Sequence, residues 1–167
     1  MKVVFLDVDG VLNDDYTNEL IPNSIFIGID NKYVKNLKKI IDATDAQIVL
    51  SSTWRIHQVK NNQNLNESVD CLKYLKKKLD KYGLHYVSTT PHINHYKRGT
   101  EIKQWIEQNN DITIDGWVIL DDQFFFDFDE EMIKHLVQTE HMKNFGYSYG
   151  LNDDDVKKAI QILNGGK

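Results

Sequence analysis

Two aspartates stand one residue apart near the start of the chain, in the stretch FLDVDGVLN at residues 5–13. An apolar run precedes them, so we expect Asp7 and Asp9 at the carboxyl end of a buried strand. Two carboxylates this close repel each other, and burying them uncompensated would be strongly destabilising. Asp121 and Asp122 follow another apolar run and would join the same cluster if the two strands are neighbours. A divalent cation with oxygen ligands would compensate this charge, and Mg2+ is the usual choice.

The same crevice would suit a phosphate group if a hydroxyl and a cation lay close by. The apolar run at residues 47–50 is followed by residues 51–53, Ser-Ser-Thr, which supply hydroxyls at a strand end. Lys97 and Arg98 stand just before a helix that we expect Thr100 to cap. A carboxylate, a metal ion, a hydroxyl and a cation are the components of a phosphoryl-transfer site.

These residues need a scaffold, and short apolar runs alternate with helical patterns along the whole chain. Strands are expected at residues 2–6, 47–50, 84–87, 117–120 and 136–138, and helices after Asp30, over 67–82, after Thr100 and after Asn152. A loop or small hairpin is expected over 14–30, and a loop over 60–67. The alternation predicts one α/β domain over residues 1–167, a Rossmann-like parallel sheet of about five strands with helices on both faces. The first, second and fourth strands should be adjacent, because their polar ends must converge.

Two stretches outside these motifs carry aromatic or acidic side chains. We expect Phe124–Phe126 to belong to the core, and the acidic run DFDEE at 127–131 to form a solvated loop and a helix start.

Composition excludes several classes of protein. The net charge of -5 argues against a protein that coats nucleic acid non-specifically, because that mode of binding needs a positive excess. Cys71 is the single cysteine, which excludes an intramolecular disulfide and a zinc site built from cysteines. The first residues lack the apolar stretch of a signal peptide, and no run approaches the length of a membrane span. We therefore expect a cytoplasmic protein with no membrane association.

In order and type, the motifs resemble those of the haloacid dehalogenase (HAD) superfamily. DVDGVLN is similar to its first motif, IVLSS to the second, the basic residue near 98 to the third and VILDD to the fourth. The details SSTWR, KRGTEI and GLNDDDVKKAI resemble more narrowly the small HAD domains found beside RNA-repair enzymes.

The resemblance implies a role for each acidic residue. Asp7 would be the nucleophile that takes the phosphoryl group as an aspartyl-phosphate. Asp9 would protonate the leaving group and then deprotonate the attacking water. Mg2+ would be held by the Asp7 side chain, the Asp9 backbone carbonyl and Asp121. Asp122 would be a further metal ligand or a partner that orients the site.

The second motif leaves a choice among Ser51, Ser52 and Thr53. Alternation along a strand turns Ser51 and Thr53 to one side and Ser52 to the other. We prefer Ser52, because it stands two residues before Trp54 as in related patterns.

The third motif leaves a choice among Lys97, Arg98 and Lys103. Lys103 lies on the helix face opposite the apolar positions, which is typical of a solvated side chain. We prefer Arg98, because it precedes the expected helix cap and its planar fork suits phosphate oxygens.

The gaps between the motifs are too short for a separate cap domain, so the site should stay open to solvent. An open site favours a large phosphorylated substrate, and on the resemblance alone the first choice is an RNA or DNA terminus. Residues expected to contact the substrate are Gly10, Thr53, Trp54, Arg55 and Lys97.

Two alternatives lack turnover. One is a phospho-accepting receiver domain, in which the phosphorylated aspartate ends the third strand; here that strand ends in YVSTT, without an acid. The other is a degenerate HAD domain that only binds a partner, and the intact Asp7 and Asp9 argue against it.

Overall fold

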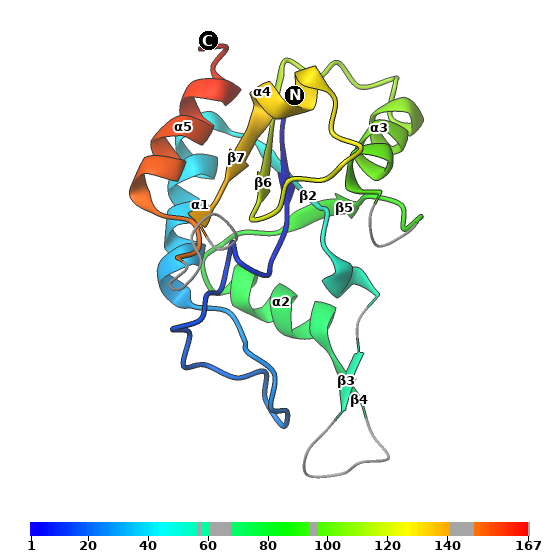
Figure 1. Ribbon diagram of the computed structural model, residues 1–167. Coiled ribbons are helices and arrows are strands. Elements are labelled where there is room, and N and C mark those ends of the chain that lie inside the picture. The colour runs from blue at the N-terminus through cyan, green and yellow to red at the C-terminus, as the bar shows by residue number, and fades with distance from the viewer. Residues whose placement is uncertain (57, 61–67, 94–96, 141–148, 167) are drawn as a thin grey trace.

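The structure of the protein is a computed structural model that describes residues 1–56, 58–60, 68–93, 97–140 and 149–166 (Figure 1). The strands are β1 (Lys2–Leu6), β2 (Gln47–Leu50), β3 (Gln58–Lys60), β4 (Ser68–Asp70), β5 (Tyr86–Thr89), β6 (Gly116–Asp121) and β7 (Leu136–Gln138). The helices are α1 (Asn31–Thr44), the 3-10 turn η1 (Thr53–Arg55), α2 (Cys71–Asp80), α3 (Arg98–Gln108), α4 (Glu130–His135) and α5 (Asp153–Leu163).

Five of these strands form one parallel sheet in the order β5-β2-β1-β6-β7. β1 lies between β2 and β6, with Leu6 opposite both Leu50 and Leu120. The predicted parallel sheet and the predicted neighbourhood of the first, second and fourth strands are therefore confirmed. Since all three strands run in the same direction, the residues that follow them lie at one edge of the sheet.

Helices cover both faces of the sheet, and the alternation along β1 shows how. Val4 and Leu6 pack into a core cluster shared with α1, α2 and α5. Val3 and Phe5 pack into a second cluster shared with α3 and α4. Figure 1 shows α1 and α5 together on one side and α3 on the other. Burial on both faces explains why β1 is a continuous apolar run instead of an alternating one.

The predicted caps of the first and last helices are confirmed. Asp30 accepts a hydrogen bond from the Lys32 amide at the start of α1. Asn152 and Asp155 form a capping box at the start of α5, in which each side chain accepts a hydrogen bond from the other residue's backbone. In the described part of the chain, no helix is both long and apolar enough to cross a bilayer.

Three predicted boundaries are wrong, and one feature was not expected. The third strand lies at Tyr86–Thr89 instead of 84–87, and the helix predicted over 67–82 is α2, Cys71–Asp80. The antiparallel pair β3–β4 precedes α2, where a loop was expected over 60–67. Of that stretch only Lys60 is among the described residues, at the end of β3.

The third wrong boundary is the start of α3, which begins at Arg98 and not after Thr100. The cap comes from elsewhere in the chain, because the Asp127 carboxylate accepts hydrogen bonds from the amides of Gly99 (3.1 Å) and Thr100 (2.7 Å). Gly99 permits this approach, since a Cβ there would lie 2.4 Å from the Asp127 carbonyl oxygen. Asp127 is therefore part of the packing of α3 and not simply solvated, whereas Asp129 begins α4 as the predicted helix start requires.

The predicted burial of Phe124–Phe126 is correct for one residue only. Phe125 is buried, whereas Phe124 is 52% exposed and Phe126 is 99% exposed. The three residues follow the end of β6 without regular structure, so successive side chains cannot all turn to the core.

Replacing Asp127 by alanine should destabilise the protein, because the first turn of α3 loses its acceptor. We expect the free energy of unfolding to fall by about 1 kcal/mol, within the usual range for a lost helix cap. Urea denaturation monitored by circular dichroism measures the change. Asp111→Ala, which removes the same charge from an exposed turn, is the matched control, and equal stability of the two variants would contradict the prediction.

Candidate active site

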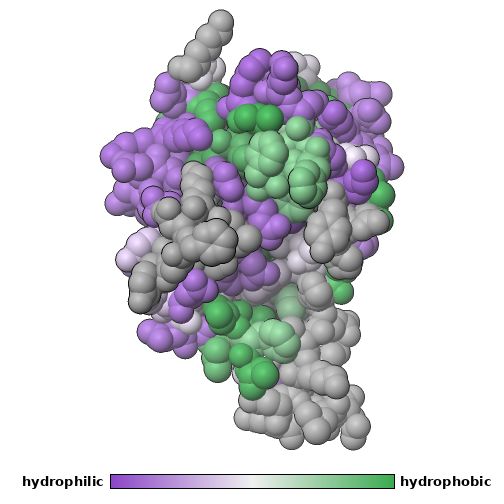
Figure 2. Space-filling model, in the orientation of Figure 1, coloured by the Kyte–Doolittle hydropathy of each residue, from purple (hydrophilic) through white to green (hydrophobic). Residues whose placement is uncertain are grey.

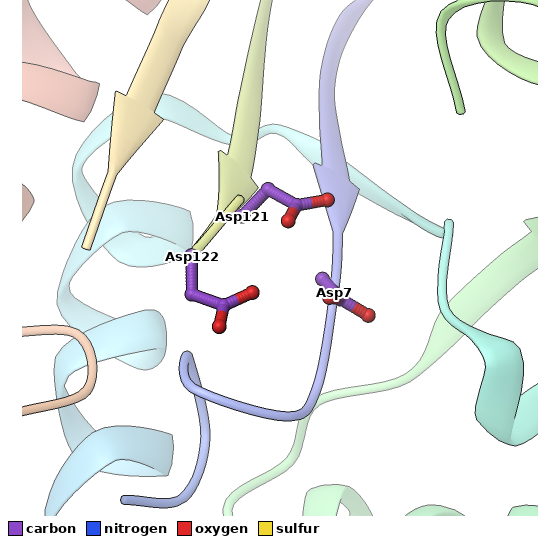
Figure 3. A group of neighbouring side chains, drawn as sticks. All are labelled: Asp7, Asp121 and Asp122. Carbon is purple, nitrogen blue, oxygen red and sulfur yellow. The ribbon is translucent and has the colours of Figure 1, made fainter. Parts of the chain in front are cut away.

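Three carboxylates meet where β1 and β6 end. Asp7 follows β1, Asp121 is the last residue of β6 and Asp122 follows it. One carboxylate oxygen from each residue lies within 4.8 Å of the others, and Figure 3 shows the three side chains gathered around one space. All three are buried, with exposed fractions of 6%, 1% and 3%. The predicted convergence of Asp7 and Asp121 is thus present in the structure.

Arg98 is the cation of this cluster. Its Nη2 lies 3.4 Å from Asp7 Oδ1, and its Nε lies 3.2 Å from Asp121 Oδ2. The guanidinium is buried and stands over the ring of Phe125, 5.3 Å from the ring centroid. If all three carboxyls are ionised, one guanidinium leaves two negative charges uncompensated.

Burial is the main cause of the unusual acidities in the cluster. It raises the pKa of Asp7, where the nearby Arg98 offsets part of the effect. Burial together with the charge of Asp7 raises the pKa of Asp121 well above its ordinary value. Burial and the charges of Asp7 and Asp9 raise the pKa of Asp122 to about 7. Burial and mutual repulsion thus favour the protonated forms of these carboxyls, and a bound cation would favour the ionised forms.

The residues present fit a hard divalent cation. The cluster offers only carboxylate oxygens, the ligands that Mg2+ prefers. Among the described residues, the buried Asp121 Oδ2 accepts no hydrogen bond, although it faces Arg98. The two uncompensated charges match the charge of the ion.

The side chain of Asp9 lies outside this cluster and is exposed. Its Oδ2 accepts a hydrogen bond from Trp54 Nε1 at 2.8 Å, and its Oδ1 accepts one from Asn13 Nδ2 at 3.0 Å. Asn13 also accepts a hydrogen bond from the Gly10 amide at 2.8 Å. Sequence reasoning did not identify Asn13, although it ends the stretch DGVLN that follows the first motif's nucleophile candidate; its type, a donor four residues after an acid, was the available signal.

Gly10 occupies a position that another residue would not tolerate. Its φ is +71°, in the left-handed region, and a Cβ would lie 2.6 Å from the Asp122 side chain. The Gly10 carbonyl accepts a hydrogen bond from Thr139 Oγ1. Gly10 therefore lets the turn after Asp9 pass close to the cluster.

The three hydroxyl residues that follow β2 have different surroundings. Ser52 is buried and forms a hydrogen bond with Asp7 that favours the ionised carboxyl. Ser51 turns toward Arg98, whose Nη1 lies 3.4 Å from the Ser51 hydroxyl, and Thr53 begins η1. Of the three candidates, Ser52 is the one beside the predicted nucleophile.

Arg55 lies away from solvent in a buried ion pair. Its Nη2 lies 2.6 Å from Glu101 Oε2, and its Nη1 donates to the carbonyl of Ser52. The ion pair ties η1 to α3, a structural role that sequence reasoning did not identify. Sequence reasoning also did not identify Glu101 as the partner of Arg55.

The two lysines considered for the third motif are not in the cluster. Lys97 is exposed at the N-cap of α3 and makes no capping hydrogen bond through its side chain. Lys103 lies on the surface and pairs with Asp129 at 2.8 Å. Arg98 alone of the three candidates lies among the carboxylates.

The raised acidities predict how the metal-free protein responds to pH. Between about pH 4 and 7 the folded protein holds a proton on Asp122 that the unfolded chain has lost, so the contribution of Asp122 to stability falls as pH rises and levels off above pH 7. One such proton contributes a slope of at most about 1.4 kcal/mol per pH unit. Melting temperatures in a chelator at pH 5 to 8 measure this, and Mg2+ should restore stability at pH 8.

Asp122→Asn is the variant that checks the cause. It should flatten the pH dependence and be more stable than the wild type at pH 8 without metal, whereas the exposed Asp111→Asn should change neither. A melting temperature that is constant across this range in the wild type would contradict the prediction.

Comparison with known proteins places the chain in a family. The family of HAD domains in Swiss Army Knife RNA repair proteins matches residues 3–156, a span that contains all four motifs. No curated protein and no solved structure matched the chain. With the match covering most of its length, the chain belongs to the family of HAD domains found in Swiss Army Knife RNA repair proteins.

Proposed function

We propose that the protein is a Mg2+-dependent phosphatase that works through an aspartyl-phosphate on Asp7. The observation that carries the proposal is the buried cluster of three carboxylates with a single guanidinium among them. Asp7, Asp121 and Asp122 would hold the ion, together with the Asp9 carbonyl that the family resemblance implies. Bound there, Mg2+ would neutralise the cluster and the oxygens of the phosphate.

Asp7 would act as the nucleophile. A carboxylate oxygen forms a bond to phosphorus while the bond from phosphorus to the leaving oxygen breaks, and water then cleaves the acyl phosphate to restore Asp7. The hydrogen bond from Ser52 and the charge of Arg98 both favour the ionised form that this attack requires.

Asp9 would transfer the protons. Its carboxyl protonates the departing oxygen in the first step and takes a proton from the attacking water in the second. Trp54 and Asn13 each donate to one of its oxygens, which fixes the plane of the carboxyl. Exposure of Asp9, in contrast to the buried cluster, lets it reach the leaving group and water.

Arg98 and Ser52 would complete the phosphate site. Arg98 bridges Asp7 and Asp121 from the first turn of α3, so its guanidinium lies beside the oxygen that attacks phosphorus. Its charge would offset the negative charge on the phosphate oxygens in the transition state. A domain that binds a partner without turnover has no need for this charge arrangement, and we do not favour that alternative.

We further propose a macromolecular phosphate as the substrate, with an RNA or DNA end as the first choice. Support comes from the family, whose description places its HAD domains in RNA repair proteins. Among the described residues, the segments inserted after β1 and β2 form single helices, short strands and loops, and not a separate cap over the site. A large substrate would then exclude water by covering the site itself.

Asp7→Asn should abolish turnover in a folded protein, since an amide is nearly isosteric with the carboxylate but is a poor nucleophile. Asp9→Asn should lower kcat by about two to four powers of ten, the usual contribution of a general acid-base group. Steady-state hydrolysis with Mg2+ measures both, and Asp111→Asn is the control of equal charge change. A well-folded Asp7→Asn variant with the wild-type rate would rule out the covalent mechanism.

A comparison of substrate classes tests the macromolecular proposal. Under one concentration of Mg2+ and salt, kcat/KM should be higher for 5′- or 3′-phosphorylated oligonucleotides than for phosphopeptides, mononucleotides and sugar phosphates. Higher values for mononucleotides or sugar phosphates than for every macromolecule would show that the open site does not select large substrates.

A further inference from the structure

A pocket of about 410 Å³ opens beside Asp9, and none of its described lining residues belongs to the carboxylate cluster. Asp9 forms part of its wall, and the remaining described lining residues are apolar: Ile21, Ile25, Phe26, Ile27, Trp54 and Cys71. Figure 2 shows the side chains of segment 20–27 as a hydrophobic group at the lower part of the molecule. This group is exposed, with Ile25 at 75% and Phe26 at 49%. An exposed apolar group at the edge of a polar site is typical of a binding surface.

The pocket is built from three parts of the chain that hold one another in place. Segment 20–27 is closed by a bridge between Leu20 and Ile27, and the residues at its base are fixed to α2. There Glu19 accepts hydrogen bonds from the Tyr74 hydroxyl at 2.9 Å and from Lys78 Nζ at 2.6 Å. Trp54 of η1 also lines the pocket. The pocket is therefore largely formed before a ligand binds.

The chemistry of the wall defines what fits. Among the described lining residues there is no cation, so the wall offers nothing to a second phosphate group. It presents an indole and a phenyl ring together with isoleucine side chains, which suit a flat apolar group. Aromatic side chains bind planar rings by stacking, at little cost in conformational entropy.

The position of Asp9 defines which part of a substrate lies there. The group that protonates the leaving oxygen must come within hydrogen-bond distance of it, so the leaving group lies on the Asp9 side of the phosphorus. Resting on the proposed phosphatase function, we propose that this pocket binds a planar aromatic ring carried by the leaving group, and that Phe26 selects for it. The ring is either a nucleoside base or an aryl group.

Two matched pairs of substrates test the inference. Adenosine 5′-monophosphate differs from ribose 5-phosphate by the base, and benzyl phosphate differs from ethyl phosphate by the ring. Every leaving group is a primary alcohol, so the intrinsic reactivity within each pair is similar. We expect kcat/KM to be higher by about tenfold for the ring-bearing member of at least one pair. An advantage in the first pair alone identifies a base, and in the second alone an aryl group.

Phe26→Ala should remove most of that advantage while leaving ribose 5-phosphate and ethyl phosphate unchanged. Phe126→Ala is the matched control, because its ring is 99% exposed and lies outside the pocket lining. Equal kcat/KM within both pairs overturns the inference. So does an advantage of the ring-bearing substrate that is as large in the Phe26→Ala variant as in the Phe126→Ala variant.

Binding separates this inference from the proposed function. Calorimetric titration of Asp7→Asn with the same four compounds gives Kd without turnover. The ring-bearing member of a pair should bind more tightly by a similar factor. This difference in Kd should disappear in the double variant that combines Asp7→Asn with Phe26→Ala. If the wild type hydrolyses neither these compounds nor the phosphorylated oligonucleotides, the phosphatase function fails, and the pocket is then tested by these Kd values alone. Equal Kd within both pairs overturns it.

Discussion

Repulsion among Asp7, Asp121 and Asp122 is the constraint on which the rest of the structure depends. The parallel register of β1 and β6 fixes the two strand ends side by side, so the carboxylates cannot separate without breaking the central ladder. Burial removes the water that would otherwise screen them, and their raised pKa values are the consequence. Arg98 compensates one charge, and a divalent cation would compensate the rest. Folding and ion binding are therefore expected to be coupled.

Arg98, the positively charged residue of the carboxylate cluster, is positioned by acidic groups that lie outside the cluster. Asp127 caps the helix that begins with Arg98, and Glu101, one turn further on, pairs with Arg55 of η1. Arg55 in turn donates to the backbone carbonyl of Ser52, so the ion pair joins α3, which begins with Arg98, to the backbone that carries Ser52. A buried pair of this kind contributes little net stability, but it fixes the relative positions of the groups it joins.

The sheet and the cluster were predictable from the sequence because both follow from local patterns: apolar runs mark strands, and acids directly after them lie at strand ends. The start of α3 was not predictable in this way. Thr100 is a good capping residue by type, but the actual cap, Asp127, lies 27 residues further along the chain. Only the packing of two loops brings it there. The predicted burial of Phe124–Phe126 was wrong for a related reason, because the backbone after β6 turns Phe125 alone toward Arg98.

Asp9 stands at the boundary between two regions of opposite character. It stands two residues after Asp7 of the charged cluster, and its side chain lines an apolar pocket. A phosphate monoester has a similar division, with a dianion at one end and an organic group at the other. Trp54 belongs to both regions, because its ring lines the pocket and its Nε1 donates to Asp9. A leaving group that displaces the indole would also remove its hydrogen bond to the Asp9 carboxyl. In the proposed mechanism, selectivity can therefore act at the proton-transferring group itself, through the described parts of the segments that follow β1 and β2.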